Sequence, residues 1–181
     1  CLVTLGWRRI LDLKDFEKVD LMVNVHPALL PEYKGYHPVP YVILNEEKVH
    51  GITAHLINEE VDAGDIIQKE SFPINTFSTL RSLQYEVNKR MPEFLRKLFD
   101  KIIEGNIDYS PNMDADTIII APIRTHKDSE VYLNEPLDEV FKKVKASDPK
   151  RFPVYFMYNG EKVYIEMYRD KEVKRVSKYD I

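Results

Sequence analysis

Three polar side chains in this chain have the types and the spacing that acid–base catalysis requires. Asn24 and His26 stand two residues apart in Asn24-Val25-His26-Pro27, so both face the same side of an extended strand. Asp62 follows 38 residues after Asn24, in Val61-Asp62-Ala63-Gly64. An amide, an imidazole and a carboxylate that meet at neighbouring strand ends can donate, accept and return a proton.

The elements that must position these groups can be predicted from apolar runs. Residues 1–5 and 21–25 form such runs, which predicts two buried strands with a loop and a short helical turn between them. Continuous apolar strands are typical of a parallel sheet covered on both faces, where ligands bind at the carboxyl ends of the strands. Asn24 and His26 fall at such an end.

The chain after the second strand is predicted to be a rigid loop followed by an antiparallel pair. Residues 27–40 contain four prolines and Gly35, and residues 41–46 can resume a helix. β-Branched residues predict strands at 51–57 and 66–70, which can pair antiparallel across a short acidic loop.

A long helical segment is predicted from residue 80. Ser78 or Thr79 can cap its start, apolar residues recur at helical spacing as far as Ile103, and Gly105 follows its end. Pro92 either kinks this helix or begins a second one. The apolar side chains are expected to be core contacts.

A polar linker at residues 106–117 predicts two parts, a catalytic domain at 1–110 and a small α+β module at 117–181. The fold class is therefore α/β with a small C-terminal α+β module. Within the module, Asn159-Gly160 is a strong type I′ turn signal. The predicted elements there are a strand at 117–123, a helix at 137–145, and a hairpin of 154–158 with 163–168.

Composition narrows the class of protein. A single cysteine excludes a disulfide within the chain, so a reducing, cytoplasmic setting is expected. No apolar run reaches the roughly 18 residues of a membrane span, so no membrane partner is expected. The net charge is −4, with +2 in residues 121–181 and −6 in residues 1–120. An acidic N-terminal part is expected to bind the tRNA polyanion poorly. A small basic patch could still bind it, so tRNA stays an alternative partner.

Three blocks of the sequence resemble the formyltransferase family that uses 10-formyltetrahydrofolate. They are Asn24-Val25-His26-Pro27 with Pro31, then Gly51-Ile52-Thr53-Ala54-His55, then Asp62-Ala63-Gly64. The family includes glycinamide ribonucleotide, methionyl-tRNA and nucleotide-sugar N-formyltransferases. Taken singly, His26 would be an ordinary strand-end histidine, and Asn24 and Asp62 turn residues. The three blocks in this order favour a functional site.

The resemblance implies a Rossmann-like sheet with flanking helices, of which this chain holds the C-terminal portion. It covers residues 1–75 well and the helical residues to about 105 more loosely. The first half of the family pattern has no counterpart here, and the chain opens at Cys1 on an apolar strand. We therefore expect a fragment of a longer polypeptide.

The resemblance also implies that Asn24, His26 and Asp62 are catalytic. Formyl transfer from a folate nitrogen to an amine passes through a tetrahedral oxyanion and moves a proton. Asn24 would donate to the oxyanion, and His26 would donate a second hydrogen bond. Asp62 would accept the proton and raise the pKa of His26.

Neighbouring residues are expected to bind the folate and the amine. Tyr36 and His37 are predicted to bind the amine, with exposure to water as the alternative for His37. His55 is expected to support the strand beside the site and His50 to lie in a solvated loop. By the resemblance, the loop from Trp7 to Leu11 would bind the folate chiefly through its backbone groups. Trp7 itself could equally be a packed loop residue. No metal site is expected. The predicted folate-binding residues are Trp7, Arg9, Ile10, Leu11, Asn58, Glu59, Glu60 and Val61.

The acceptor is predicted from the C-terminal module. Its small size and near-neutral charge favour a nucleotide-linked amino sugar, with methionyl-tRNA as the alternative. A formyltetrahydrofolate hydrolase and a non-catalytic folate- or nucleotide-binding relic are further alternatives. A homodimer is compatible with each of them.

Overall fold

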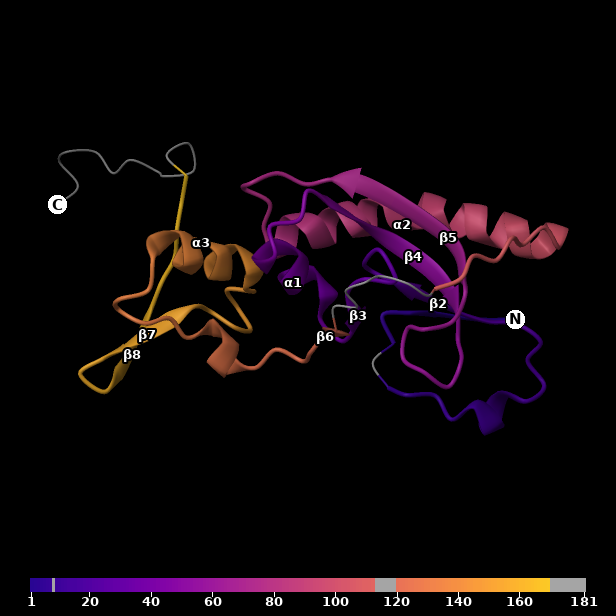
Figure 1. Cartoon of the computed structure of the whole chain (residues 1–181), viewed down its shortest axis with the longest axis horizontal. Helices are drawn as coiled ribbons and strands as arrows, with labels where there is room; N and C mark the ends of the chain where they lie inside the picture. The colour runs from indigo at the N-terminus through magenta and orange to yellow at the C-terminus, as the bar shows by residue number, and fades with distance from the viewer. Residues whose placement is uncertain (8, 113–119, 170–181) are drawn as a thin grey trace.

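A computed structural model describes residues 1–7, 9–112 and 120–169. Its main sheet is mixed, with strand order β1-β2-β4-β5 (Figure 1). β1 runs parallel to β2, and the pairs β2–β4 and β4–β5 are antiparallel. The parallel pairing expected of the first two strands and the antiparallel pairing of the two later strands are both confirmed. The strands are β1 (Leu2–Leu5), β2 (Met22–His26), β4 (Val49–Leu56) and β5 (Ile66–Pro73).

β1 lies at one edge of this sheet, and its residues are only partly buried, so the prediction of a buried strand is wrong there. The 3-10 helix η1 (Leu13–Phe16) follows it and confirms the predicted short turn. Asp12 caps η1 by accepting a hydrogen bond from the backbone N–H of Lys14. The segment between β1 and β2 is therefore mostly loop.

The helix α2 (Leu80–Glu104) packs against β4 and β5 (Figure 1). Thr79 and Ser82 form a capping box at its start, and Gly105 at φ 67° ends it in the left-handed region. The helix continues through Pro92, so a second helix beginning there is wrong. Ile103 is 82% exposed and is not a core contact as predicted. The buried stripe consists of Leu80, Leu83, Val87, Met91, Phe94 and Leu98.

The loop after β2 contains more regular structure than predicted. The helix α1 (Pro38–Leu44) begins at Pro38 rather than at residue 41, because a proline in the first turn has no N–H that needs a helical partner. β3 (Lys34–Gly35) pairs in parallel with β6 (Ile120–Ala121). A Cβ on Gly35 would lie 2.7 Å from the Ala121 carbonyl oxygen, so this pairing requires glycine.

The C-terminal elements enclose a second, smaller apolar cluster built on Val131, Val140 and Val154. The predicted helix and hairpin are confirmed. The second strand of the hairpin begins at Glu161 rather than at residue 163, because the two-residue turn sets Glu161 opposite Tyr158. The elements are η2 (His126–Ser129), α3 (Leu137–Ala146), β7 (Tyr155–Tyr158) and β8 (Glu161–Tyr164).

These elements also contact the N-terminal part. α3 packs against α1, and Lys145 Nζ on α3 donates to the Thr76 carbonyl oxygen at 2.8 Å. Residues 117–119 and 170–181 of the predicted module lie outside the described residues, and the domain boundary stays a prediction. No helix in the part of the chain that the structure describes has the length and apolar character needed to cross a bilayer.

Candidate active site

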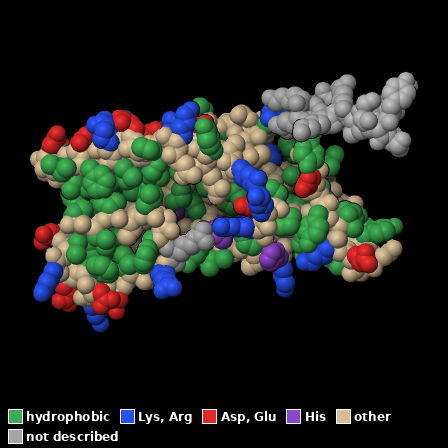
Figure 2. Space-filling model, turned by 180° about the vertical axis from the view of Figure 1, so that it is seen from behind, with side chains coloured by type: hydrophobic (Ala, Val, Ile, Leu, Met, Phe, Trp, Pro, Cys, Tyr) green, Lys and Arg blue, Asp and Glu red, His purple; other side chains and the backbone are tan. Residues whose placement is uncertain are grey.

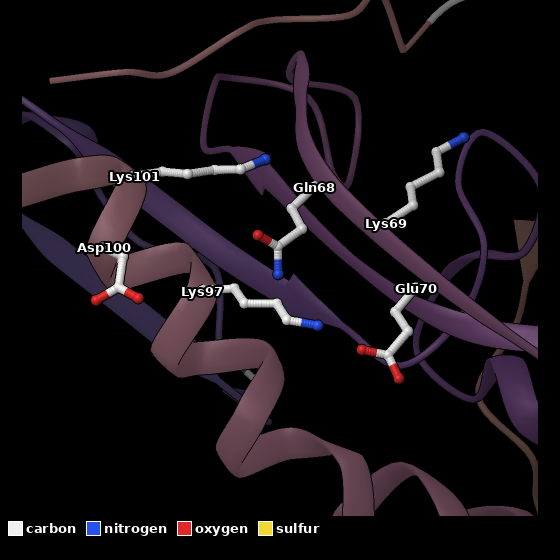
Figure 3. Close-up of a pocket in the computed structure, with 6 residues that line it drawn as sticks. All are labelled: Gln68, Lys69, Glu70, Lys97, Asp100 and Lys101. Carbon is white, nitrogen blue, oxygen red and sulfur yellow. The ribbon is translucent and has the colours of Figure 1, made fainter. Parts of the chain in front are cut away.

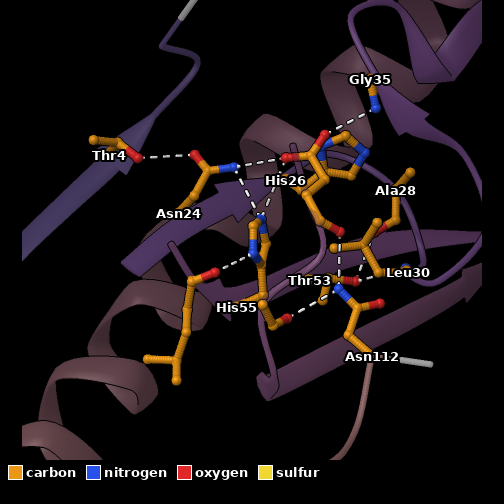
Figure 4. Close-up of polar contacts among 12 residues, drawn as sticks. Thr4, Asn24, His26, Ala28, Leu30, Gly35, Thr53, His55 and Asn112 are labelled. Carbon is orange, nitrogen blue, oxygen red and sulfur yellow. Dashed lines mark hydrogen bonds and ion pairs between the residues drawn. The ribbon is translucent and has the colours of Figure 1, made fainter. Parts of the chain in front are cut away.

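Asn24, His26 and Asp62 meet at one end of the sheet. Asn24 and His26 project from the last residues of β2, and Asp62 lies in the loop between β4 and β5. The carboxylate of Asp62 approaches His26 and also His55 on β4, with 3.4 Å to each ring. Figure 4 shows the side chains of Asn24, His26 and His55 turned toward one another. The structure thus brings together all three predicted catalytic residues.

The Asn24 amide is oriented by its neighbours. Its Oδ1 accepts from Thr4 Oγ1 on β1 at 2.9 Å. Its Nδ2 lies 3.1 Å from His55 Nε2 and donates to Asp62 Oδ1 at 3.3 Å. The contact with Asp62 is longer than the usual N–H···O distance of about 2.9 Å. This N–H can therefore turn toward another acceptor at little cost.

The hydrogen bonds of the two histidines show which nitrogen of each ring carries a proton. His26 Nε2 donates to the Tyr33 carbonyl oxygen at 2.8 Å, and His55 Nδ1 donates to the Leu56 carbonyl oxygen at 2.7 Å. A carbonyl only accepts, so these nitrogens carry the protons. The remaining nitrogens, His26 Nδ1 and His55 Nε2, face the Asp62 carboxylate.

The carboxylate of Asp62 has donors at both oxygens. The Gly35 backbone N–H donates to Oδ2 at 2.8 Å, and Asn24 donates to Oδ1. Burial acts to raise the pKa of Asp62, but the neighbouring His55 and His26 rings and the hydrogen bond from the Gly35 N–H outweigh it and lower that pKa below its usual value. Asp62 is therefore ionised at neutral pH.

The pKa of His26 moves opposite to our expectation. Burial lowers the pKa of His26, because only 4% of the residue is exposed, and the raising effects of the Asp62 carboxylate and the Tyr33 carbonyl do not outweigh it. The expected rise of this pKa is wrong, and His26 is neutral at pH 7. Its Nδ1 can accept a proton.

A cavity of about 850 Å³ opens beside these residues. All of the predicted folate-binding residues line it, as do Tyr36 and His37. Residues of the C-terminal part also line it, among them Arg124, Arg151 and Phe152. In Figure 2, Lys, Arg and His side chains gather near the middle of the molecule, beside larger hydrophobic areas. One cavity is thus lined by the polar cluster and by residues of both the N-terminal and the C-terminal parts of the chain.

Comparison with known proteins decides the family. The formyl transferase family profile matches residues 1–98, more than half of the chain. The chain belongs to the formyl transferase family. A methionyl-tRNA formyltransferase from Lactobacillus acidophilus is 28% identical over 162 residues, which cover 89% of this chain and 51% of the relative. The chain therefore spans about half the length of the curated relatives it matches.

Solved structures share the fold of this formyl transferase chain. A 4-N formyltransferase from Francisella tularensis superposes with a TM-score of 0.78 at 23% identity, covering 96% of this chain and 71% of that one. WlaRD, a sugar 3N-formyl transferase solved with dTDP and 5-N-formyl-THF, gives a TM-score of 0.71 at 22% identity. That match covers 89% of this chain and 58% of WlaRD. The mixed sheet with flanking helices is confirmed by these structures.

Sequence patterns did not identify Thr4 and Gly35 as site residues, and they indicated only a supporting role for His55. Thr4 and Gly35 bond directly to Asn24 and Asp62, and His55 contacts both. In the sheet His55 stands directly opposite Asn24. Side chains alternate between the two faces of a strand, so the sequence could have placed His55 on the same face as Thr53. It could not give the register of β4 against β2, which sets His55 opposite Asn24.

His50 is not in a solvated loop. It lies in β4 with 1% exposure, and its ring packs edge-on against Phe72 with centroids 5.4 Å apart. Neither ring nitrogen has a hydrogen-bond partner among the described residues. Burial lowers the pKa of His50 to about 4, so the ring is neutral at pH 7.

A second, smaller cleft of about 430 Å³ lies at the opposite edge of the sheet, between β5 and α2. Figure 3 shows charged side chains from both elements along it. Gln68 already donates to the Phe94 carbonyl oxygen at 2.9 Å. Lys101 Nζ lies 3.5 Å from the Ile67 carbonyl oxygen. Glu70, Lys97 and Asp100 also have ion-pair partners within the fold, so the polar groups of this cleft are largely engaged.

No group of three or more His, Cys, Asp or Glu residues is arranged to hold a metal ion within residues 1–7, 9–112 and 120–169.

Proposed function

We propose that this chain carries the catalytic residues for transfer of a formyl group from 10-formyltetrahydrofolate to an amine. The observation that supports this most is the position of the ionised Asp62, between His26 and His55 and beside the Asn24 amide. This cluster borders a cavity lined by every residue predicted to bind the folate. Family membership gives the reaction type its further support.

The chemistry divides among the three residues as follows. The amine nitrogen attacks the formyl carbon, and the oxygen becomes an oxyanion that the Asn24 Nδ2–H can stabilise after releasing Asp62. His26 Nδ1 and Asp62 Oδ2, 3.4 Å apart, are both acceptors, so one proton taken from the amine can be shared between them. The folate nitrogen leaves and receives a proton in exchange.

The cavity also suggests where the acceptor binds. Tyr36, His37, Arg151 and Phe152 line the same cavity as the catalytic cluster. A guanidinium can bind an anionic group, and an aromatic ring can pack against a ring system. These lining residues therefore favour a nucleotide-linked amino sugar as the acceptor.

A second acceptor is favoured by a separate observation. The curated relative from Lactobacillus acidophilus is named a methionyl-tRNA formyltransferase, and its similarity extends over 89% of this chain. Under this proposal the amine is that of the methionyl group esterified to tRNA. Binding would then weaken strongly as salt is raised, because phosphate contacts release counterions.

The test is turnover by the full-length protein. We expect tetrahydrofolate to appear when 10-formyltetrahydrofolate and an acceptor amine are both present. The acceptors compared are a nucleotide-linked amino sugar and methionyl-tRNA. Release of formate without any amine would instead show a hydrolase. Equal turnover in wild type and Asp62→Ala would reject the catalytic assignment, and folate binding without turnover would favour a non-catalytic binding protein.

A further inference from the structure

Asn112 holds the backbone of the loop that carries Asp62. Its Nδ2 donates to the carbonyl oxygens of Asp62 and Gly64, both at 2.9 Å (Figure 4). The two partners are 50 and 48 residues away in sequence, and Asn112 is 2% exposed. The sequence predicted a polar linker for this segment, so the burial of Asn112 comes from tertiary contacts and not from local composition.

The loop that Asn112 contacts has an unusual shape. Asp62 has a φ of 52°, in the left-handed region that residues with a side chain seldom adopt. Two residues later, a Cβ on Gly64 would lie 2.1 Å from the Leu56 carbonyl oxygen, so the chain passes very close to the end of β4. Such a backbone persists only where the surrounding structure holds it.

The segment that carries Asn112 is itself anchored. Ser110 exchanges two backbone hydrogen bonds with Ile66 at the start of β5, at 2.8 and 2.9 Å. Asn112 thus has a fixed base from which it reaches the loop just before β5. The carbonyl partners also explain the choice of side chain, because an amide nitrogen has two N–H donors on one atom and an aspartate has none.

The amide oxygen points to a specific role for Asn112. Asn112 Oδ1 is buried and has no hydrogen-bond partner among the described residues. Leaving a buried acceptor unpaired is costly, so a residue that only filled space here would be apolar. The two donated hydrogen bonds are therefore what this position requires.

We propose that Asn112 is a positioning residue for formyl transfer, acting through Asp62. By fixing the carbonyls on both sides of the turn, it sets where the Asp62 carboxylate lies between His26 and His55. The effect on formyl transfer rests on the proposed function, whereas the placement of the Asp62 carboxylate by Asn112 does not. The carboxylate meets four partners at 2.8 to 3.4 Å, so a small movement of its backbone would lose several of them.

The first measurement needs no activity. In the full-length protein, the imidazole NMR signals of His26 and His55 are compared in wild type, Asn112→Asp, Asn112→Ala and Asp62→Asn. We expect both Asn112 variants to shift these signals in the direction that Asp62→Asn shifts them, because each removes the carboxylate from between the rings. The matched control is Asn106→Ala, an exposed residue just after α2, which should leave the signals unchanged. Unchanged histidine signals in both Asn112 variants would overturn the inference.

The second measurement separates positioning from general damage. We expect Asn112→Ala to lower kcat about 100-fold, the loss that a shift of about 1 Å in a catalytic group can produce. The KM of the acceptor and the Kd of tetrahydrofolate should change less than about threefold, because the cavity walls stay in place. A rise in Kd that matches the fall in kcat would indicate a structural role and contradict the proposal. Absence of turnover in wild type would reject the proposed function, while the NMR comparison would still decide the geometry.

Discussion

Replacing Asn24 tests the catalytic assignment most directly. We expect Asn24→Ala to lower kcat by about 100- to 1000-fold, the usual loss when one donor to an oxyanion is removed. The structure supports this size because Asn24 Nδ2 has one N–H directed at His55 and a second, at 3.3 Å from Asp62, that can turn to the substrate. Substrate binding should change little, since the lost interaction forms only as the oxyanion develops.

A second substitution tests how Asn24 is oriented. Thr4 Oγ1 donates to Asn24 Oδ1 at 2.9 Å, which keeps the amide nitrogen on the side of Asp62. Thr4→Val keeps the shape and β-branching but removes this hydrogen bond, worth about 1 kcal/mol. Such a loss corresponds to about a fivefold fall in kcat. In the Asn24→Ala background, Thr4→Val should have no further effect on kcat, because Thr4 acts through Asn24.

The assay is single-turnover release of tetrahydrofolate by the full-length protein with saturating acceptor. Asn106→Ala serves as the control for loss of an exposed asparagine. The reasoning fails if Asn24→Ala stays within about threefold of wild type, or if Thr4→Val lowers kcat by the same factor with and without Asn24.

Three further predictions concern stability and acceptor binding. The His50 pKa is about 4 when folded and about 6.5 when unfolded, so the unfolded chain binds more protons, and wild type should lose about 3 kcal/mol of stability as pH falls from 6.5 to 4. His50→Leu should remove this loss in urea unfolding at the two pH values. Gly64→Ala should destabilise by about 1–3 kcal/mol through its clash with Leu56, and by more than Gly105→Ala, where a Cβ meets nothing within 4 Å. Arg151→Ala should raise the KM of an anionic acceptor about tenfold and leave the Kd of tetrahydrofolate unchanged. An equal effect on both ligands would place Arg151 outside the acceptor site.

The sequence determined those features that depend on neighbours along the chain. α2 begins at the capping box of Thr79 and ends at the left-handed Gly105, close to the positions that the residue types predict. Asn159 and Gly160 both adopt positive φ and close the predicted hairpin. The types and spacing of Asn24, His26 and Asp62 also identified the polar cluster, since alternation along a strand places the first two on one face.

Other features depend on partners that are distant in the sequence. α2 runs through Pro92, which residue-level rules treat as a break or a kink. His50 is buried because β4 lies between two strands and beneath α2, although its local sequence is polar. Asn112 belongs to a segment of linker composition, and only the pairing of Ser110 with Ile66 brings it to the Asp62 loop.

The protonation state of the candidate site was decided by tertiary structure alone. From the sequence, a carboxylate near His26 predicts a higher pKa for that ring, yet burial lowers it. Desolvation sums contributions from every element around a group, here β2, β4 and the loops at Tyr33 and Asp62. Chemical type and spacing can be read residue by residue along the chain, whereas the loss of water around His26 exists only once these segments have packed together.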